Sequence, residues 1–132
     1  MKKILFSICA VFMAFMMASC GDPTSKVKSL TEDIEKNGDE WTDEEQWDSA
    51  YETIATCVIE FAESDPDQDA FEEFKDACED CYSAMYDISE KKAIKARKKA
   101  EDKFEKKHKD LKKDMDKAEK KMKKLIKKFE DD

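Results

Sequence analysis

The side chains best able to carry redox chemistry are three cysteines that follow the N-terminal apolar segment. Cys78 and Cys81 have the CxxC spacing of thiol oxidoreductases, but two acidic residues stand between them, and the pair falls inside an expected helix. Reactive CxxC pairs lie at a helix N-terminus near positive charge, which lowers the thiol pKa. The neighbouring carboxylates disfavour a thiolate here, so we expect no redox enzyme.

A metal site would need the cysteines to converge with His108, the single histidine of the chain. Cys57, Cys78, Cys81 and His108 would be a chemically suitable zinc set. The sequence offers no second close-spaced pair of ligands, however, and His108 lies thirty residues beyond Cys78 in a highly charged segment. We therefore expect no metal site, and we interpret His108 as a polar position of a helix.

The many carboxylates show no catalytic pattern. The segment Asp65–Asp69 alternates like the start of a calcium loop, but it has Ala70 and Asp76 where such a loop needs Gly and Glu. The chain has no Gly-rich phosphate loop and no HExxH motif. The sequence predicts neither an enzyme nor a cofactor.

A lysine-rich segment at the C-terminal end is the main candidate for binding an anionic partner. Apolar residues recur within it at helical spacing, which is typical of a basic amphipathic helix that lies on an anionic surface. The lysines that would bind anionic lipid or polymer are Lys112, Lys113, Lys117, Lys120, Lys121, Lys124, Lys127 and Lys128. The alternative is that these lysines face water while the apolar seam packs within the protein.

The elements that position these residues are all expected to be helices. Apolar spacing predicts a first helix from residue 24 or 25 to Asn37, with Gly38 in the left-handed conformation as its stop. Thr42 and Glu45 form a capping box that predicts the start of a second helix. Asp65 is the expected N-cap of a third helix, because Pro66 suits a first helical position.

The third helix is expected to continue without a break. No Gly or Pro follows Pro66, so we favour one helix as far as Glu130, bent near residues 87–91 and ~97 Å long at 1.5 Å per residue. The alternative is a new helix that starts at the weak capping box formed by Asp87 and Glu90. Its C-terminal part carries a seam with a period of 3.5, as in coiled coils. The seam consists of Phe104, His108, Leu111, Met115, Ala118, Met122, Leu125 and Phe129.

The predicted fold is all-α, a small helical hairpin or bundle followed by a long, charged, coiled-coil-like helix. Residues 20–90 carry four lysines against 23 carboxylates, a net charge of −19, and residues 91–132 carry 19 basic against ten acidic residues, a net charge of +9. We divide the chain into an acidic bundle, residues 26–90, and a basic helix, residues 91–132. The seam must fold back on the bundle, pair with a second copy or meet a partner.

The first 20 residues read as an export signal. Lys2 and Lys3 precede an apolar run that ends in Met17-Ala18-Ser19-Cys20. This ending resembles the lipobox of bacterial lipoproteins, a family in which signal peptidase II cuts before the cysteine and the cysteine is acylated. The resemblance implies a signal peptide of residues 1–19, lipidation of Cys20 and a lipidated tether of residues 20–25. It also implies a membrane-anchored protein of the cell envelope that faces away from the cytoplasm.

Export also bears on the three remaining cysteines. An oxidising compartment permits a disulfide from Cys57 to Cys78 or Cys81. In a tight hairpin turning near Asp65, however, Cys78 would lie ~7 Å along the axis from the residue opposite Cys57. A disulfide needs Cα atoms within about 7 Å, so the pairing stays open against the alternative of three small core residues.

Because the sequence contains no catalytic motif, two non-enzymatic functions remain. The first is a non-enzymatic structural or protein-binding role in the envelope, in which the seam meets another copy or another envelope protein. The second is a surface-bridging module whose basic helix binds anionic lipid or envelope polymer. Nucleic acid is not an expected partner of an exported lipoprotein.

Overall fold

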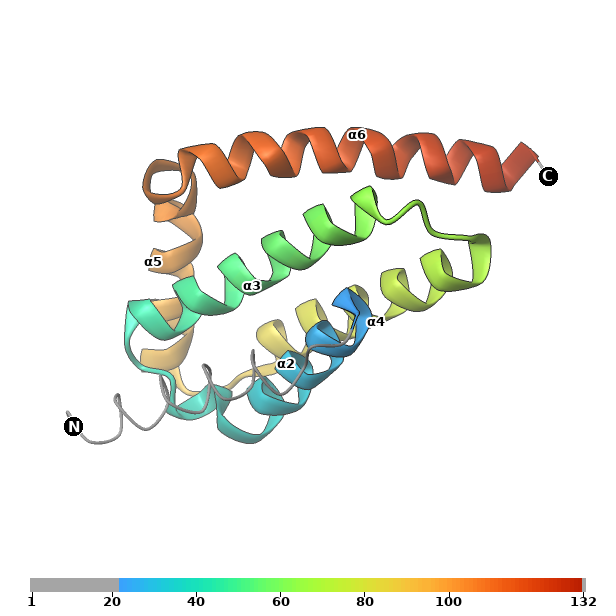
Figure 1. Cartoon of the computed structure of the whole chain (residues 1–132). Helices are drawn as coiled ribbons and strands as arrows, with labels where there is room; N and C mark the ends of the chain where they lie inside the picture. Colours follow the sequence, from blue (N-terminus) through green and yellow to red (C-terminus); the bar gives the residue numbers. More distant parts are fainter. Residues whose placement is uncertain (1–21, 132) are drawn as a thin grey trace.

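The structure, a computed structural model, describes residues 22–131 and is all-α over that range (Figure 1). The elements are α2 (Pro23–Asn37), a 3-10 turn η1 (Gly38–Glu40), α3 (Glu44–Glu63), α4 (Gln68–Asp87), α5 (Lys91–Lys107) and α6 (Lys109–Asp131). The all-α prediction is confirmed for these residues. Met17–Cys20 lies outside the described residues, so the lipobox and the signal peptide stay predictions.

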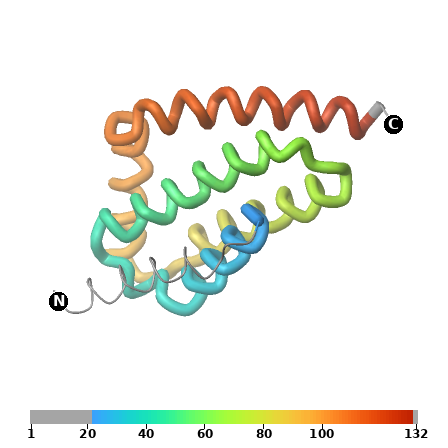
Figure 2. The backbone as a smooth tube through the Cα atoms, in the orientation of Figure 1, coloured from blue at the N-terminus to red at the C-terminus, as the bar shows by residue number. Residues whose placement is uncertain are grey.

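The helices form three layers, with α3 in the middle (Figure 1). α3 packs against α6 on one side and against α2 on the other, and α2 packs against α4. α5 contacts α3 and η1 and lies across the end of the layers, as the tube in Figure 2 shows. The C-terminal segment therefore folds back along the body, which is the first of the three arrangements considered for the seam.

The first helix begins as predicted and ends differently. Asp22 is the N-cap of α2, and its side chain accepts a hydrogen bond from the N–H of Ser25 at 2.9 Å. Gly38 has φ of −54°, so the prediction of a left-handed stop is wrong. A Cβ built on Gly38 would lie 2.9 Å from Cγ2 of Ile88 and 3.2 Å from Cγ2 of Ile34. Glycine is required here for close packing and not for its backbone freedom.

The next two helix starts are each displaced from the predicted residue. α3 has Asp43 as its N-cap, one residue after the predicted Thr42, and the Asp43 N–H donates to Oε1 of Gln46 at 3.3 Å. α4 has Asp67 as its N-cap, because the Asp67 side chain accepts from the N–H of Ala70 at 2.8 Å. Asp65 instead adopts φ of 52°, a left-handed conformation that a short polar side chain tolerates, so it turns the chain before the cap.

The prediction of one helix from Pro66 to Glu130 is wrong. α4 ends at Asp87, and the chain is not helical again until α5 begins at Lys91. Ile88 is only 9% exposed, and the carboxylate of Asp39 accepts hydrogen bonds from the N–H groups of Ser89 at 2.8 Å and Glu90 at 3.1 Å. These contacts hold residues 88–90 out of a helix, at the place where Asp87 and Glu90 form only a weak capping box. A second break at His108 divides the expected basic helix into α5 and α6.

A mixed aromatic and small-residue core joins the layers. The rings of Phe61 and Phe74 stack at 4.1 Å between α3 and α4. Trp41 and Trp47 meet edge to face at 5.0 Å, and the Trp47 Nε1–H donates to the Trp41 carbonyl at 2.7 Å. The buried apolar residues of α5 are the alanines Ala93, Ala96 and Ala100. Small side chains on this helix allow its close approach to α3.

Candidate functional site

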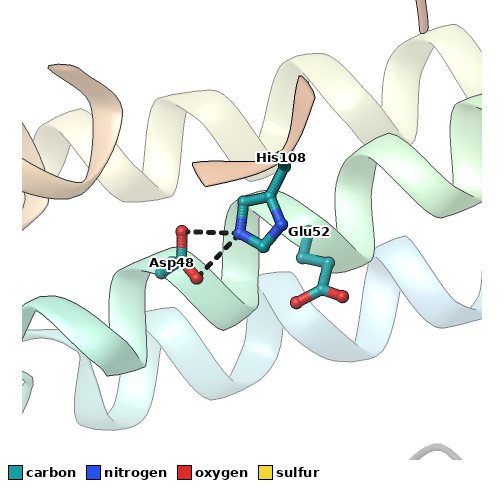
Figure 3. Close-up of side chains that lie close together, drawn as sticks. All are labelled: Asp48, Glu52 and His108. Carbon is teal, nitrogen blue, oxygen red and sulfur yellow. Dashed lines mark hydrogen bonds and ion pairs between the residues drawn. The ribbon is translucent and has the colours of Figure 1, made fainter. Parts of the chain in front are cut away.

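Three side chains converge where α3 passes the turn between α5 and α6 (Figure 3). Asp48 and Glu52 lie one turn apart on α3, so they share a face of that helix. His108 comes from the turn itself, sixty residues away from Asp48 in the chain. We call Asp48, Glu52 and His108 the corner cluster.

The backbone of the turn holds His108 in place. Its N–H donates to the carbonyl of Phe104 at 2.9 Å, and its own carbonyl accepts from the N–H of Lys112 at 2.9 Å. His108 thus closes α5 and opens α6, with φ of −128° and ψ of 57°. Its ring lies 5.0 Å from that of Phe104, which in turn lies 6.3 Å from that of Tyr51 on α3. These contacts direct the imidazole toward α3.

The imidazole meets both oxygens of one carboxylate. Nε2 of His108 lies 3.1 Å from Oδ1 and 3.0 Å from Oδ2 of Asp48, and both side chains are half-buried. The exposed carboxylate of Glu52 completes the group, with one ligand atom of each residue lying within 4.8 Å of the others. An imidazole nitrogen and carboxylate oxygens are donors that divalent transition metals accept.

Sequence reasoning considered His108 as a ligand only together with the cysteines. The structure places His108 with two carboxylates of α3 instead. Asp48 and Glu52 are spaced i and i+4, a pattern that could have been noted, but nothing in the sequence shows which of the many such acidic pairs faces the turn.

Cys57, Cys78 and Cys81, which we call the thiol cluster, lie in the core as free thiols. Cys57 and Cys81 are buried, and Cys78 is half-buried. Burial raises the thiol pKa to about 11 for Cys57, about 12 for Cys78 and about 11 for Cys81. At neutral pH such thiols are protonated and poor nucleophiles. All three side chains lie in the core or pack against it, and a disulfide from Cys57 to Cys78 or Cys81 stays a prediction.

The lysines of α6 point away from the body. The apolar seam of α6 faces α3 and α4: Ala118 is buried, Met122 and Leu125 pack against the core, and the ring of Phe129 lies 5.5 Å from that of Phe71. We define the α6 lysine face by the exposed side chains Lys117, Lys120, Lys121, Lys124, Lys127 and Lys128. Lys113 is exposed as well. The structure therefore combines a packed seam with solvent-facing lysines.

Lys112 differs from the other lysines of this set. It is half-buried and lies 3.4 Å from a carboxylate oxygen of Asp116 and 3.7 Å from one of Glu105. Among the eight lysines predicted to bind an anionic surface, Lys112 is the one that makes an ion pair within residues 22–131. Lys112 thus contributes to the turn between α5 and α6, and the α6 lysine face begins five residues later, at Lys117.

The opposite layer carries charge of the other sign. The exposed carboxylates of α2 and α4 include Glu32, Glu35, Glu72, Asp76, Glu79 and Asp80. α2 begins in this layer at Pro23, on the far side of α3 from α6 (Figure 1).

No family model, curated protein or solved structure matches this chain. Among residues 22–131, no helix has both the length and the apolar character needed to cross a bilayer.

Proposed function

We propose that this chain is a lipid-anchored, exported protein with a non-enzymatic role as a surface-bridging module of the cell envelope. Cys20 would hold one end at a membrane, and the α6 lysine face would bind a second, anionic surface, either lipid headgroups or an envelope polymer. The observation that supports this proposal best is the division of α6 into a seam packed on the body and a lysine face open to solvent.

The charge of this face is concentrated. Residues 117–128, which include the six lysines of this face together with Lys123 and Glu119, carry a net charge of +6 within about three helical turns. Basic side chains attract anionic surfaces over roughly a Debye length, about 8 Å at physiological ionic strength. Because the apolar seam is occupied by α3, electrostatic attraction would dominate this contact, and the binding would be strongly sensitive to salt.

The order of the layers supports binding of a second surface by the α6 lysine face, rather than binding of the membrane that holds the lipid anchor. α2 begins at Pro23, three residues after the predicted lipid anchor, in the layer opposite α6. A body held by that end would direct the α6 lysine face away from its own membrane. Binding of the second surface would then join two structures of the envelope.

A protein-binding role is the second candidate, and one observation favours it. Tyr82 and Tyr86 lie one turn apart on α4 and are 39% and 59% exposed, and the guanidinium of Arg97 lies 4.4 Å above the Tyr86 ring. Exposed tyrosines are enriched where proteins associate. A coiled coil between copies, in contrast, would require α6 to leave α3, because its seam is packed there.

A vesicle-tethering assay tests the bridging proposal. The full lipidated chain is reconstituted in neutral vesicles, anionic vesicles are added, and aggregation is followed by light scattering. We expect tethering that declines steeply between about 50 and 300 mM salt, because these concentrations lie below and above physiological ionic strength and the Debye length shortens between them. The triple variant Lys120→Glu, Lys124→Glu, Lys127→Glu should abolish it.

The matched control makes the same change of charge on α5. The lysines Lys92, Lys95 and Lys99 are exposed there, and their replacement by Glu should leave most of the tethering intact. Equal loss in both triple variants would show that only net charge matters and would refute a binding role of the α6 lysine face. A salt-tolerant oligomer without tethering would favour the protein-binding candidate.

A further inference from the structure

We infer that the corner cluster is a binding site for a divalent transition-metal ion, with Zn²⁺ as the best match to its donors. The site joins Asp48 and Glu52 of α3 to His108 in the turn between α5 and α6. This inference does not depend on the proposed bridging function, because it concerns a different face of the molecule.

The separation between His108 and Asp48 matches that of neighbouring ligands around a small dication. Zn²⁺ binds imidazole nitrogen and carboxylate oxygen at about 2.0–2.2 Å, so neighbouring ligand atoms around it lie roughly 3.0–3.5 Å apart. Nε2 of His108 already lies 3.0 Å and 3.1 Å from the two oxygens of Asp48. The third donor, a Glu52 oxygen, lies within 4.8 Å of a ring nitrogen of His108 and of a carboxylate oxygen of Asp48. The remaining gap would be closed by a rotation of the exposed Glu52 side chain.

The charge of the cluster also favours a dication. Asp48 and Glu52 supply two carboxylates, and a neutral imidazole supplies the third donor. Glu52 makes no ion pair among residues 22–131, in contrast to Glu44 one helical turn before Asp48, whose carboxylate lies 3.3 Å from Nζ of Lys103. The Glu52 carboxylate is therefore available to a ligand, and two such charges neutralise one Zn²⁺.

The scaffold fixes two of the three donors before any ion arrives. Asp48 is half-buried on the middle helix, and the His108 ring is held by backbone hydrogen bonds on both sides of the turn and by the Phe104 ring. Preorganised ligands bind with a smaller loss of side-chain freedom. Three protein donors leave one position of a tetrahedral ion to water, the arrangement of an open zinc site.

The competing interpretation is that the His108–Asp48 pair only stabilises the fold. In that case Glu52 is an exposed side chain that takes no part in the cluster. The two interpretations differ in what Glu52 does. Removal of its charge leaves the His108–Asp48 hydrogen bonds intact, so a purely structural pair predicts no effect. A metal site predicts that affinity falls when a ligand is lost.

The test uses zinc chloride and the full chain in detergent, with binding measured by isothermal titration calorimetry. We expect one ion per chain. Changes to outer-shell residues typically reduce metal affinity by about 10- to 100-fold, so Glu52→Gln and His108→Gln, which remove ligands, should reduce it by at least that factor. Glu45→Gln is the matched control, because Glu45 is also exposed on α3 but lies outside the cluster. It should bind zinc like the wild type.

Cobalt chloride supplies a second readout that identifies the donors. Co²⁺ bound by nitrogen and oxygen gives only weak visible bands, whereas bound thiolate adds an intense ultraviolet charge-transfer band. The inference is refuted by an absence of zinc binding, by equal affinity in Glu52→Gln and the wild type, or by a thiolate band that survives in His108→Gln. Circular dichroism of each variant without metal confirms that the fold is kept.

Discussion

Substitution of Gly38 by Ala tests how tightly the α2–η1 junction packs against the break between α4 and α5. Gly38 has φ of −54°, which alanine adopts freely, so the backbone alone would favour the change. Replacing Gly by Ala at a compatible position stabilises by about 0.4–1 kcal/mol, because the unfolded chain loses freedom. The added methyl group, however, would lie 2.9 Å from Cγ2 of Ile88 and 3.2 Å from Cγ2 of Ile34.

The clash should outweigh the gain. Cγ2 is attached directly to Cβ, so it cannot move aside without a shift of the backbone or a change of rotamer. Overpacking of this kind costs about 1–3 kcal/mol. We therefore expect Gly38→Ala to lower the free energy of unfolding by about 1 kcal/mol, or the melting temperature by ~4 °C for a domain of this size.

Urea unfolding followed by tryptophan fluorescence measures the effect directly. Trp41 and Trp47 are fully buried, and Cη2 of Trp47 lies 3.7 Å from the site of the new methyl group. The midpoint should fall while the dependence on urea concentration stays the same, which is the signature of changed stability without a changed mechanism of unfolding.

A double-mutant cycle with Ile88→Ala identifies the cause. Ile88→Ala alone removes the clashing group and should cost about 2–4 kcal/mol as a core truncation. In the double variant the Gly38→Ala change should become neutral or stabilising, a coupling of at least ~1 kcal/mol. Additive effects would refute the reasoning, because they would place the cost in the backbone and not in the contact with Ile88.

Three further predictions concern the break, the core and the thiols. Hydrogen bonds from the backbone N–H groups of Glu90 and Ser89 lower the pKa of Asp39 below its ordinary value of 3.8. The stability that Asp39 contributes is therefore present above about pH 4 and is lost as the pH falls through the lowered pKa. Asp39→Asn should reduce the acid dependence of the urea midpoint between pH 5 and pH 2, and an unchanged dependence would contradict this role. Phe74→Ala removes the 4.1 Å stack on Phe61 and should cost about 3–5 kcal/mol, measured by thermal unfolding; a loss below ~1 kcal/mol would show that the stack is not part of the stable core. The thiol cluster should react with Ellman's reagent at pH 8 only after unfolding, because burial raises each thiol pKa to about 11 or 12. A thiol that reacts rapidly in the folded protein would revive a redox role.

The helices themselves were predictable from local pattern. The spacing of Val27, Leu30 and Ile34 identifies the buried face of α2, and all three residues are at most 2% exposed. Trp47 and Phe61 lie fourteen residues apart, which is helical spacing on one face of α3, and both are buried. To predict the buried face of a helix, only the spacing of its apolar residues is needed, and that spacing can be read from the sequence.

The breaks and the corner cluster could not be predicted in the same way. Residues 88–90 contain no Gly or Pro, and their backbone groups are satisfied by Asp39, fifty residues earlier in the chain. The interpretation of His108 as a polar position of a helix is wrong, because it lies in the turn between α5 and α6. Its partner Asp48 is fixed only once α6 turns back along α3. Such contacts arise from the packing of distant segments, so a local pattern carries no signal for them.

The shallow packing of α6 has a consequence for how the molecule opens. Between residues 109 and 130 only Ala118 is fully buried, whereas α3 alone buries nine residues. Proteins open in cooperative units whose free energies follow the apolar area that each unit buries. α6 is therefore a unit of low local stability, attached to the rest through the turn at His108. Its partial release would expose a free amphipathic helix while the core formed by α2, α3 and α4 stays folded.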